Sequence, residues 1–544
     1  MNAAQLFVKC LEQEQVEFIF GLPGEENLAL LDALADSPIK FISVRHEQAA
    51  AFMADVYGRL TGKAGVCLST LGPGATNLVT GIADAFLDRA PVVAVTAQTA
   101  LEKLHKESHQ AIDIIGMFRG ITKWNARIER ASVVPEVVRK AFKLAQAEKP
   151  GPCHIELPED VASSSTDAGP MEMERARRPS PDRPSLKMAA ELIDASSRPI
   201  ILAGNGVIRG QASEELLRFS RATGIPVANT FMGKGVVPWD YELSLLSIGL
   251  QTHDVVNCGF DEADLVIAIG YDFVEYAPRL WNSGRNKKII HVDFTPSEVD
   301  EAYPPAVEVV ADIRETLELL RPLIRRPKKL DEPKKLRQYI LDDLKRFAQD
   351  EQMPMKPQRI LSDLRAALGR RDLVISDVGA HKLWIARMFL PVEPNTVIIS
   401  NGFASMGIAL PGAIAAKLVE PKRPVVAVCG DGGFLMNSQE LETAVRFKTN
   451  PVIIVFNDGG YGLIHWKQTA QFKRTFGVTF GNPDFVKFAE SFGAKGYRVG
   501  AAKEFKPILT EALRQSVPSV IDVPIDYHEH GRLTEQLGNL VCPI

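Results

Sequence analysis

Short apolar segments alternate with helix-like segments along the whole 544-residue chain, and this alternation constrains the fold most strongly. In the first third, FIFG, FISV, GVCLS, VVAVTA and CHIELP are apolar runs typical of buried strands, and residues 48–61 have the pattern of a helix between two of them. Strands that alternate with helices form parallel sheets with helices on both faces. The pattern therefore predicts an α/β fold of doubly wound parallel sheets.

Two polar segments divide the chain into three such units. Residues 164–185 are rich in Ser, Pro and charged residues and have no apolar period, which is typical of a linker. Residues 326–352 combine most of the run RRPKKLDEPKK with a charged helix. That run could form an anion-binding surface, although a solvated linker is the favoured interpretation. We therefore predict domains at 1–163, 186–325 and 353–544.

Composition excludes several classes of protein. Lys and Arg number 63 against 67 Asp and Glu, a net charge of −4, which argues against a nucleic-acid binder. No apolar run reaches about 18 residues, so no membrane span is expected. The N-terminus lacks the pattern of a signal peptide. The six cysteines form no CxxC pair and lie mostly in apolar segments, which favours reduced core residues in a cytoplasmic protein over disulfides or a zinc site.

A glycine-rich acidic turn, Gly430-Asp431-Gly432-Gly433, follows the apolar run PVVAVC in the third domain. A turn of this kind between a strand and a helix lets backbone N–H groups approach a phosphate. Taken alone, the turn is a weak signal, and ordinary strand–turn–helix packing is the favoured interpretation.

A second turn, containing Asp458 and Gly460, follows the apolar run PVIIVFN, and Asp458 lies 27 residues after Asp431. Two carboxylates at the carboxyl ends of neighbouring strands would repel each other unless a cation lay between them. Mg²⁺ prefers carboxylate, carbonyl and phosphate oxygens. The pair of turns therefore predicts a Mg²⁺-bridged diphosphate site, with Asp431 and Asp458 as carboxylate ligands and the Gly460 carbonyl as a third.

Two features of the first domain have more than one interpretation. Glu47, in VRHEQAAAFM, is either a surface carboxylate at a helix N-terminus or a buried catalytic acid. Gly72 and Gly74, in LSTLGPGATN, either shape a cofactor site or form a packing turn.

The spacing of GDGG and the Asn-Asp turn resembles the thiamine diphosphate motif of the pyruvate decarboxylase and acetolactate synthase superfamily. The resemblance covers essentially the whole chain. It implies a pyrimidine-binding domain, a central domain and a diphosphate-binding domain. It also implies a cofactor held between the first domain of one subunit and the third domain of another, and hence at least a homodimer.

The same resemblance implies roles for individual residues. Glu47 would hydrogen-bond N1′ of the aminopyrimidine, and Gln110 and His109 would lie near the reacting carbons, although a lone histidine is more often structural. Met406 would hold the cofactor in its bent conformation. The remaining residues implied to contact the cofactor are Leu22, Gly24, Gly72, Gly74, Gly379, His381, Gly430, Gly432, Gly433 and Tyr461.

Within the superfamily, MNSQELETAVRFK and SNGFASMGIALP resemble acetolactate synthases. The central segment AIGYDFVEYAPRLWNSG resembles the flavin-independent, catabolic branch, because it lacks the arginine of an F-D-D-R segment, so FAD is not expected. The glycines of LAGNGVIRG could cradle a dinucleotide, but packing is the preferred interpretation. At Leu463, Ile464 and Lys467 the chain departs from the family, and Lys467 either binds a substrate carboxylate or points to solvent.

The activity implied is the thiamine diphosphate- and Mg²⁺-dependent decarboxylation of pyruvate and its joining to a second pyruvate, which gives 2-acetolactate. The sequence leaves three alternatives open. A 2-oxo acid decarboxylase would release an aldehyde, a pyruvate oxidase would need flavin, and a non-catalytic homologue would only bind the cofactor. The partners implied are small 2-oxo acids and a second copy of the chain.

Overall fold

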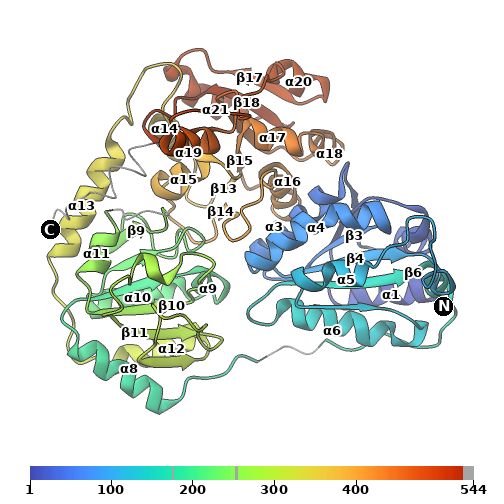
Figure 1. Ribbon diagram of the computed structural model, residues 1–544, viewed down its shortest axis with the longest axis horizontal. Helices are drawn as coiled ribbons and strands as arrows, with labels where there is room; N and C mark the ends of the chain where they lie inside the picture. The colour runs from blue at the N-terminus through green and yellow to red at the C-terminus, as the bar shows by residue number, and fades with distance from the viewer. Residues whose placement is uncertain (174–176, 251–254, 531–544) are drawn as a thin grey trace.

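The computed structural model describes residues 1–173, 177–250 and 255–530. It contains three six-stranded sheets in which every named strand pair is parallel, and helices flank each sheet. In Figure 1 the sheets occur in chain order, from the blue N-terminal unit through the green central unit to the orange and red C-terminal unit. The predicted α/β fold of doubly wound parallel sheets is confirmed.

The N-terminal sheet has the strand order β2-β1-β3-β4-β6-β5. Its strands are β1 (Phe18–Gly21), β2 (Lys40–Ser43), β3 (Gly65–Ser69), β4 (Val92–Gln98), β5 (Trp124–Arg127) and β6 (Pro152–Pro158). Its helices are α1 (Ala3–Gln13), α2 (Leu28–Ala35), α3 (Glu47–Thr61), α4 (Gly72–Leu87), α5 (Ile114–Phe118), α6 (Val134–Gln146) and α7 (Glu159–Ser163). The middle strands β3, β4 and β6 are buried along their whole length, as expected of a sheet covered on both faces.

The central sheet has the order β12-β11-β10-β7-β8-β9. Its strands are β7 (Pro199–Ala203), β8 (Val227–Asn229), β9 (Ser244–Ser247), β10 (Leu265–Ile269), β11 (Lys288–Asp293) and β12 (Val307–Val310). Its helices are α8 (Arg183–Ala195), α9 (Asn205–Arg209), α10 (Ser213–Thr223), α11 (Asn257–Asp261) and α12 (Ile313–Leu320). The charged helix α13 (Glu332–Lys345) then leads to the last domain.

The C-terminal sheet has the order β14-β13-β15-β16-β18-β17. Its strands are β13 (Leu373–Ser376), β14 (Val397–Ile399), β15 (Val425–Gly430), β16 (Val452–Asn457), β17 (Lys495–Arg498) and β18 (Ser519–Pro524). Its helices are α14 (Pro357–Ala367), α15 (Ala380–Met388), α16 (Ala409–Val419), α17 (Asp431–Met436), α18 (Glu440–Arg446), α19 (Gly462–Phe472), α20 (Phe485–Ser491) and α21 (Phe505–Ala512).

The first and third domains pack together through α3 and α16. A Cβ atom added at Gly412 would lie 2.7 Å from the side chain of Val56, so the two helices approach closely at this glycine. Buried residues of both helices belong to one apolar cluster that also includes strands of both sheets. This packing fixes how the two domains of one chain are arranged.

Cysteine chemistry partly differs from the expectation. Cys10, Cys67, Cys153 and Cys429 are buried free thiols. Cys258 is disulfide-bonded, so the expectation of reduced cysteines is wrong for this residue. The absence of CxxC spacing says nothing about cysteines that are distant in sequence, and this is why the prediction failed. Cys542 lies outside the described residues.

None of the helices in the described part of the chain is both long and apolar enough to cross a membrane.

Candidate active site

The two acidic turns of the C-terminal domain lie side by side. They follow β15 and β16, neighbouring strands in which Gly430 pairs with Phe456. Because both strands run in the same direction, both turns leave the sheet at the same edge. Parallel pairing thus places Asp431 and Asp458 next to each other, as the spacing predicts.

Asp431 connects the two turns. Its Oδ1 accepts the Gly432 N–H at 2.8 Å, and its Oδ2 accepts the Gly459 N–H at 2.8 Å. Asn482 donates its side-chain amide to the same Oδ2 at 2.7 Å. The carboxylate is 1% exposed, so these hydrogen bonds hold it in one orientation.

The Asp431 carboxylate acts electrostatically on the carboxyl of Asp458. Burial and then the nearby Asp431 carboxylate raise the pKa of Asp458 to about 7. Burial likewise raises the pKa of Asp431. A divalent cation between the two carboxylates would stabilise their charged forms. It would offset both the cost of burying the charges and the repulsion between them.

These residues line a pocket of about 170 Å³. The structure brings together all ten residues of this domain that the sequence predicts for cofactor or metal binding. They are Gly379, His381, Met406, Gly430, Asp431, Gly432, Gly433, Asp458, Gly460 and Tyr461. Among the described residues, the lining comes from the C-terminal domain alone.

Two glycines of the pocket lie against neighbouring side chains that leave no room for a side chain of their own. A Cβ atom at Gly432 would lie 2.9 Å from the ring of Tyr461, and one at Gly433 would lie 2.9 Å from Asp377 Oδ2. Next to them, the buried His381 has no hydrogen-bond partner for Nε2 among the described residues, and burial lowers its pKa to about 3. A neutral imidazole and bare backbone therefore face the space where a diphosphate would lie.

The segment that carries Met406 is anchored by Asp377, a residue that the sequence analysis missed. Asp377 Oδ1 accepts the Val378 N–H at 2.7 Å and the Gly407 N–H at 2.8 Å. Gly407 has a φ of 94°, which favours glycine, and its carbonyl accepts the Asn437 side-chain amide at 3.0 Å. The position of Met406 at the pocket thus depends on fixed backbone on either side.

Asn482 and Tyr527 are further site residues that sequence reasoning did not find. Asn482 lies between β16 and α20, and Tyr527 follows β18 and lines the pocket. Burial, together with the charges of Asp458 and Asp431, holds the pKa of Tyr527 well above its usual range. Neither residue belongs to a glycine-rich turn. The only sequence feature that could have pointed to Tyr527 is its position just after the last buried strand of the sheet.

In the N-terminal domain, Glu47 is the first residue of α3 and is 5% exposed. Its Oε2 accepts the Asn77 side-chain amide at 2.9 Å. A Cβ atom at Gly74 would lie 3.2 Å from Glu47 Oε1, so the glycine leaves this carboxylate oxygen uncrowded. The interpretation of Glu47 as a surface carboxylate is therefore wrong, although it does stand at a helix N-terminus.

Other predicted residues of this domain gather around Glu47. Gly72 has a φ of 33°, and a Cβ atom there would lie 2.5 Å from the carbonyl of Gln110. At Gly24 a Cβ atom would lie 2.4 Å from Thr70, and Leu22 packs against the same apolar cluster as α3. Together with Glu47, these positions form a second cluster of predicted site residues at the carboxyl edge of the N-terminal sheet. We call it the N-terminal cluster.

His109, Gln110 and Lys467 are exposed side chains in this chain. The backbone carbonyl of Gln110 lies next to Gly72, whereas His109 forms no hydrogen bond with the residues around Glu47 in the described part of the chain. Lys467 lies on α19, one turn beyond Leu463 and Ile464, and it does not line the pocket. Its charge contributes to the lowered pKa of the buried His530.

Comparison with known proteins agrees with this arrangement. The chain matches three family descriptions: the N-terminal TPP binding domain of thiamine pyrophosphate enzymes over residues 1–117, their central domain over 186–320, and their C-terminal TPP binding domain over 377–523. The probable acetolactate synthase large subunit of Methanocaldococcus jannaschii is 39% identical over 100% of this chain and 96% of its own length.

Two bacterial relatives are similar over almost the whole chain. The acetolactate synthase of Bacillus subtilis is 36% identical, over 99% of this chain and 97% of the relative. The catabolic acetolactate synthase of Raoultella terrigena is also 36% identical, over 98% and 97%. With three matching domains and full-length relatives, this chain belongs to the thiamine pyrophosphate enzyme family as an acetolactate synthase-like, thiamine diphosphate-dependent enzyme.

Proposed function

We propose that this enzyme, with Mg²⁺, decarboxylates pyruvate and joins the resulting two-carbon unit to a second pyruvate, which gives 2-acetolactate and CO₂. The observation that supports this most directly is the pairing of Asp431 and Asp458 at one pocket, in a chain whose full-length relatives are named acetolactate synthases. The names of those relatives favour carboligation over simple release of an aldehyde.

The residues of the pocket fit a metal-bound diphosphate. Asp431 and Asp458 would hold Mg²⁺ with the Gly460 carbonyl, and the glycines after β15 would leave backbone N–H groups open to phosphate oxygens. The raised pKa of Asp458 supports this assignment, because a cation beside it would stabilise its charged form. When bound, thiamine diphosphate supplies the electron sink that lets a 2-oxo acid lose CO₂.

The chain's own residues would prepare that chemistry. Glu47 is buried and oriented by Asn77, so its carboxyl is suited to hold and move a proton at N1′ of the aminopyrimidine. Met406, Leu463 and Ile464 give the pocket an apolar wall. Such a wall excludes water and favours the loss of a carboxylate charge as CO₂.

A complete site would need two copies of the chain. Glu47 belongs to the N-terminal cluster, and no described residue of that domain lines the pocket that holds Asp431. Helix α19, which borders the pocket, has no buried residue, and its Ile464 and Phe472 are 47% and 60% exposed. We therefore propose a homo-oligomer in which the Glu47 cluster of one copy covers the pocket of another.

We do not expect the enzyme to bind flavin. The glycine-rich turn after β7 is the natural cradle for a dinucleotide diphosphate, but Glu275 already occupies it. Both carboxylate oxygens of Glu275 accept the Asn205 N–H at 3.1 Å, and Thr230 donates its hydroxyl to the same group. Because this carboxyl already takes up the Asn205 N–H, that amide is not available to a diphosphate. The purified protein should be colourless, and a flavin absorption band that survives gel filtration would contradict this.

Product analysis tests the proposed activity. Purified enzyme with thiamine diphosphate, Mg²⁺ and pyruvate should release CO₂ and acetolactate in a ratio near one, as the balance of the reaction requires. Acetaldehyde or acetate as the main product would reject carboligation while retaining the cofactor assignment. We also propose that the enzyme is cytoplasmic and that its substrates are small 2-oxo acids.

A further inference from the structure

Helix α4 begins at the N-terminal cluster and ends at a different part of the molecule. A Cβ atom at Gly74, in its first turn, would lie 3.2 Å from Glu47 Oε1, and Asn77 donates its side-chain amide to Glu47 Oε2 at 2.9 Å. Asp84 follows seven residues later, about 10 Å along the helix axis and on the same face of the helix. One face of α4 therefore presents polar side chains to two separate places.

Helix α3 lies against α4 along this length. Near the ends of both helices, Arg59 Nη1 donates to Asp88 Oδ2 at 3.2 Å. Midway, a Cβ atom added at Gly81 would lie 2.4 Å from the Cβ atom of Ala51, so the two helices are in close contact there. Together with the contact that Asn77 makes at their beginnings, these interactions hold α3 and α4 together as one unit.

The last turn of α4 holds the segment that leads to Met406. Asp84 Oδ1 accepts the Ser400 hydroxyl at 2.7 Å and the Ser405 N–H at 3.3 Å. The Ser405 N–H also donates to Ser400 Oγ at 3.1 Å. Asp84 and Ser400 are both 0% exposed, so water does not compete for these hydrogen bonds. Since Ser405 directly precedes Met406, a residue of the N-terminal domain supports a side chain that lines the pocket.

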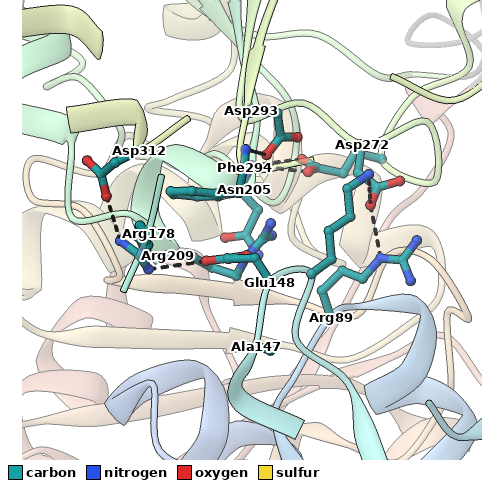
Figure 2. Close-up of polar contacts among 12 residues, drawn as sticks. Arg89, Ala147, Glu148, Arg178, Asn205, Arg209, Asp272, Asp293, Phe294 and Asp312 are labelled. Atoms are coloured by element: carbon teal, nitrogen blue, oxygen red, sulfur yellow. Dashed lines mark hydrogen bonds and ion pairs between the residues drawn. The ribbon is translucent and has the colours of Figure 1, made fainter. Parts of the chain in front are cut away.

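The residues that follow α4 fix the same segment to the central domain. Asp88 Oδ1 accepts the Gly402 N–H at 2.6 Å, and a Cβ atom at Gly402 would lie 2.8 Å from the side chain of Val274. Arg89 then donates its Nε to Asp272 Oδ2 at 2.9 Å, and Figure 2 shows its guanidinium directed toward this acid. The end of α4 is thus held where all three domains meet.

A strained residue lies between these contacts. Ala404, which lines the pocket beside Met406, has a φ of 58°, a left-handed conformation that is uncommon for a residue with a Cβ atom. Such a conformation persists only where the surrounding structure holds it. The hydrogen bonds of Gly402 and Ser405 to the end of α4 stand on either side of it. Without them, the backbone at Ala404 could relax and Met406 would shift.

We propose that Asp84 is a positioning residue for Met406, and that α4 thereby serves two active sites. The second part rests on the proposed function, in which Glu47 acts at the pocket of another copy of the chain. The first turns of α4 then orient Glu47 for that other pocket, whereas its last turn positions Met406 in the pocket of its own chain. A displacement of α4 would alter both sites.

The first test is hydrogen exchange in the cofactor-free, full-length protein, which does not depend on activity. In Asp84→Ala, amides of residues 400–407 should exchange about tenfold faster or more, because this segment loses a buried acceptor. Asp84→Asn keeps an acceptor oxygen and should exchange as the wild type does. The control is Ser220→Ala, which removes a buried hydroxyl bonded to the Ile225 carbonyl in the central domain and should leave residues 400–407 unchanged. Unchanged exchange in Asp84→Ala overturns the proposal.

The second test asks which site Asp84 serves. In a mixed dimer of Glu47→Gln and Asp431→Ala, the proposed function leaves one working site, with Glu47 from the Asp431→Ala copy and the pocket from the Glu47→Gln copy. Adding Asp84→Ala to the copy that supplies the pocket should lower the restored activity by about tenfold or more, because a small misplacement can cost about a hundredfold. Adding it to the copy that supplies Glu47 should have little effect.

Asn77→Leu is the counterpart, since Asn77 orients Glu47, and it should lower the restored activity only in the copy that supplies Glu47. The proposal is overturned if Asp84→Ala acts equally in both copies or in neither. If the two parent variants restore no activity, the two-copy site is rejected, and hydrogen exchange alone decides whether Asp84 positions the segment before Met406. Should Asp84→Ala fail to fold, Ser400→Ala removes the same hydrogen bond from the other side and replaces it in both measurements.

Discussion

Asn482 donates its side-chain amide to Asp431 Oδ2 at 2.7 Å, from a position 51 residues further along the chain. The same amide group donates to Asn457 Oδ1 at 3.0 Å, so it joins both acidic turns. Asn482 Oδ1 is buried and has no partner among the described residues. This asparagine therefore orients a proposed metal ligand without being predicted to bind the metal itself.

Replacing Asn482 with leucine should loosen Asp431 while leaving both proposed carboxylate ligands in place. Loss of an outer hydrogen bond to a metal ligand typically costs about 10–100-fold in metal affinity. We expect the Mg²⁺ concentration for half-maximal activity to rise in this range, with a smaller change in kcat at saturating Mg²⁺. Asn450→Ala, which removes an amide bonded to the Gln515 carbonyl in the same domain, is the control. Equal Mg²⁺ dependence in both variants would show that Asn482 is only structural.

Glu47→Gln keeps the size of the side chain and its contact with Asn77 but removes the exchangeable carboxyl proton. Activity should fall by about 10²–10⁴-fold, as for a positioned acid–base group. Cofactor affinity, measured by fluorescence titration, should change far less, because the diphosphate contacts lie in another domain. Glu12→Gln, an exposed acid hydrogen-bonded to Ser37, serves as the control. Near-normal turnover in Glu47→Gln would exclude the proton-transfer role.

The sequence predicted the parts of this fold that depend on local pattern. Buried strands such as β15 and β16 are continuous apolar runs, and the turns that follow them are marked by Gly and Asp. Parallel pairing then brings these turns together with no further information. For this reason all ten residues that the sequence predicts for cofactor or metal binding in the C-terminal domain surround one pocket.

What the sequence did not predict has non-local causes. The edge strands β5 (WNAR) and β17 (KGYR) have no fully buried residue, so they lack an apolar run and depend on pairing with β6 and β18. Asn482 and Asp377 have roles fixed only by which backbone groups come near them in the folded chain. Polar residues of this kind are common in loops, and local sequence does not distinguish them.

A buried acidic cluster links α3 and α4 to the segment before Met406. Asp84 Oδ1 accepts the Ser400 hydroxyl at 2.7 Å, and Asp88 accepts the Gly402 N–H at 2.6 Å and a charged hydrogen bond from Arg59 at 3.2 Å. Burial raises the pKa of Asp55 to about 7 despite the nearby Arg59. Burial and the neighbouring Asp88 and Asp55 hold the pKa of Asp84 well above its usual range.

Stability should therefore fall as pH rises. Asp55 and Asp84 bind protons more tightly in the folded chain than in the unfolded chain, so the free energy of unfolding decreases from the unfolded Asp pKa, about 3.9, up to pH 7 and above. Asp55→Asn should reduce the fall in Tm between pH 5.5 and pH 8, as followed by differential scanning fluorimetry. Asp36→Asn, at an exposed position, should behave as the wild type. A fall of equal size in Asp55→Asn would exclude this origin.

Lys467 remains a prediction for acceptor binding, since it is exposed on α19 and lies outside the pocket of its own chain. A second pyruvate brings a carboxylate into a largely apolar site, where an unpaired charge is costly. Lys467→Met should therefore lower the ratio of acetolactate to acetaldehyde, while pyruvate consumption falls less. Lys473→Met, at the end of the same helix, is the matched control. An unchanged ratio would mean that Lys467 is a solvated residue.

Complementation between two inactive variants tests whether the site spans two copies of the chain. Glu47→Gln and Asp431→Ala each disable every site when present alone. If Glu47 of one copy acts at the Asp431 pocket of another, a mixed dimer contains one site with both changes and one with neither. Mixing the variants under exchange should then restore up to about a quarter of wild-type activity, because half of the dimers are mixed and each has one intact site. A site formed within one chain would never regain both residues, so the mixture would stay inactive. The decisive control is the double variant mixed with Asp431→Ala, in which every pocket lacks Asp431 and no activity should return.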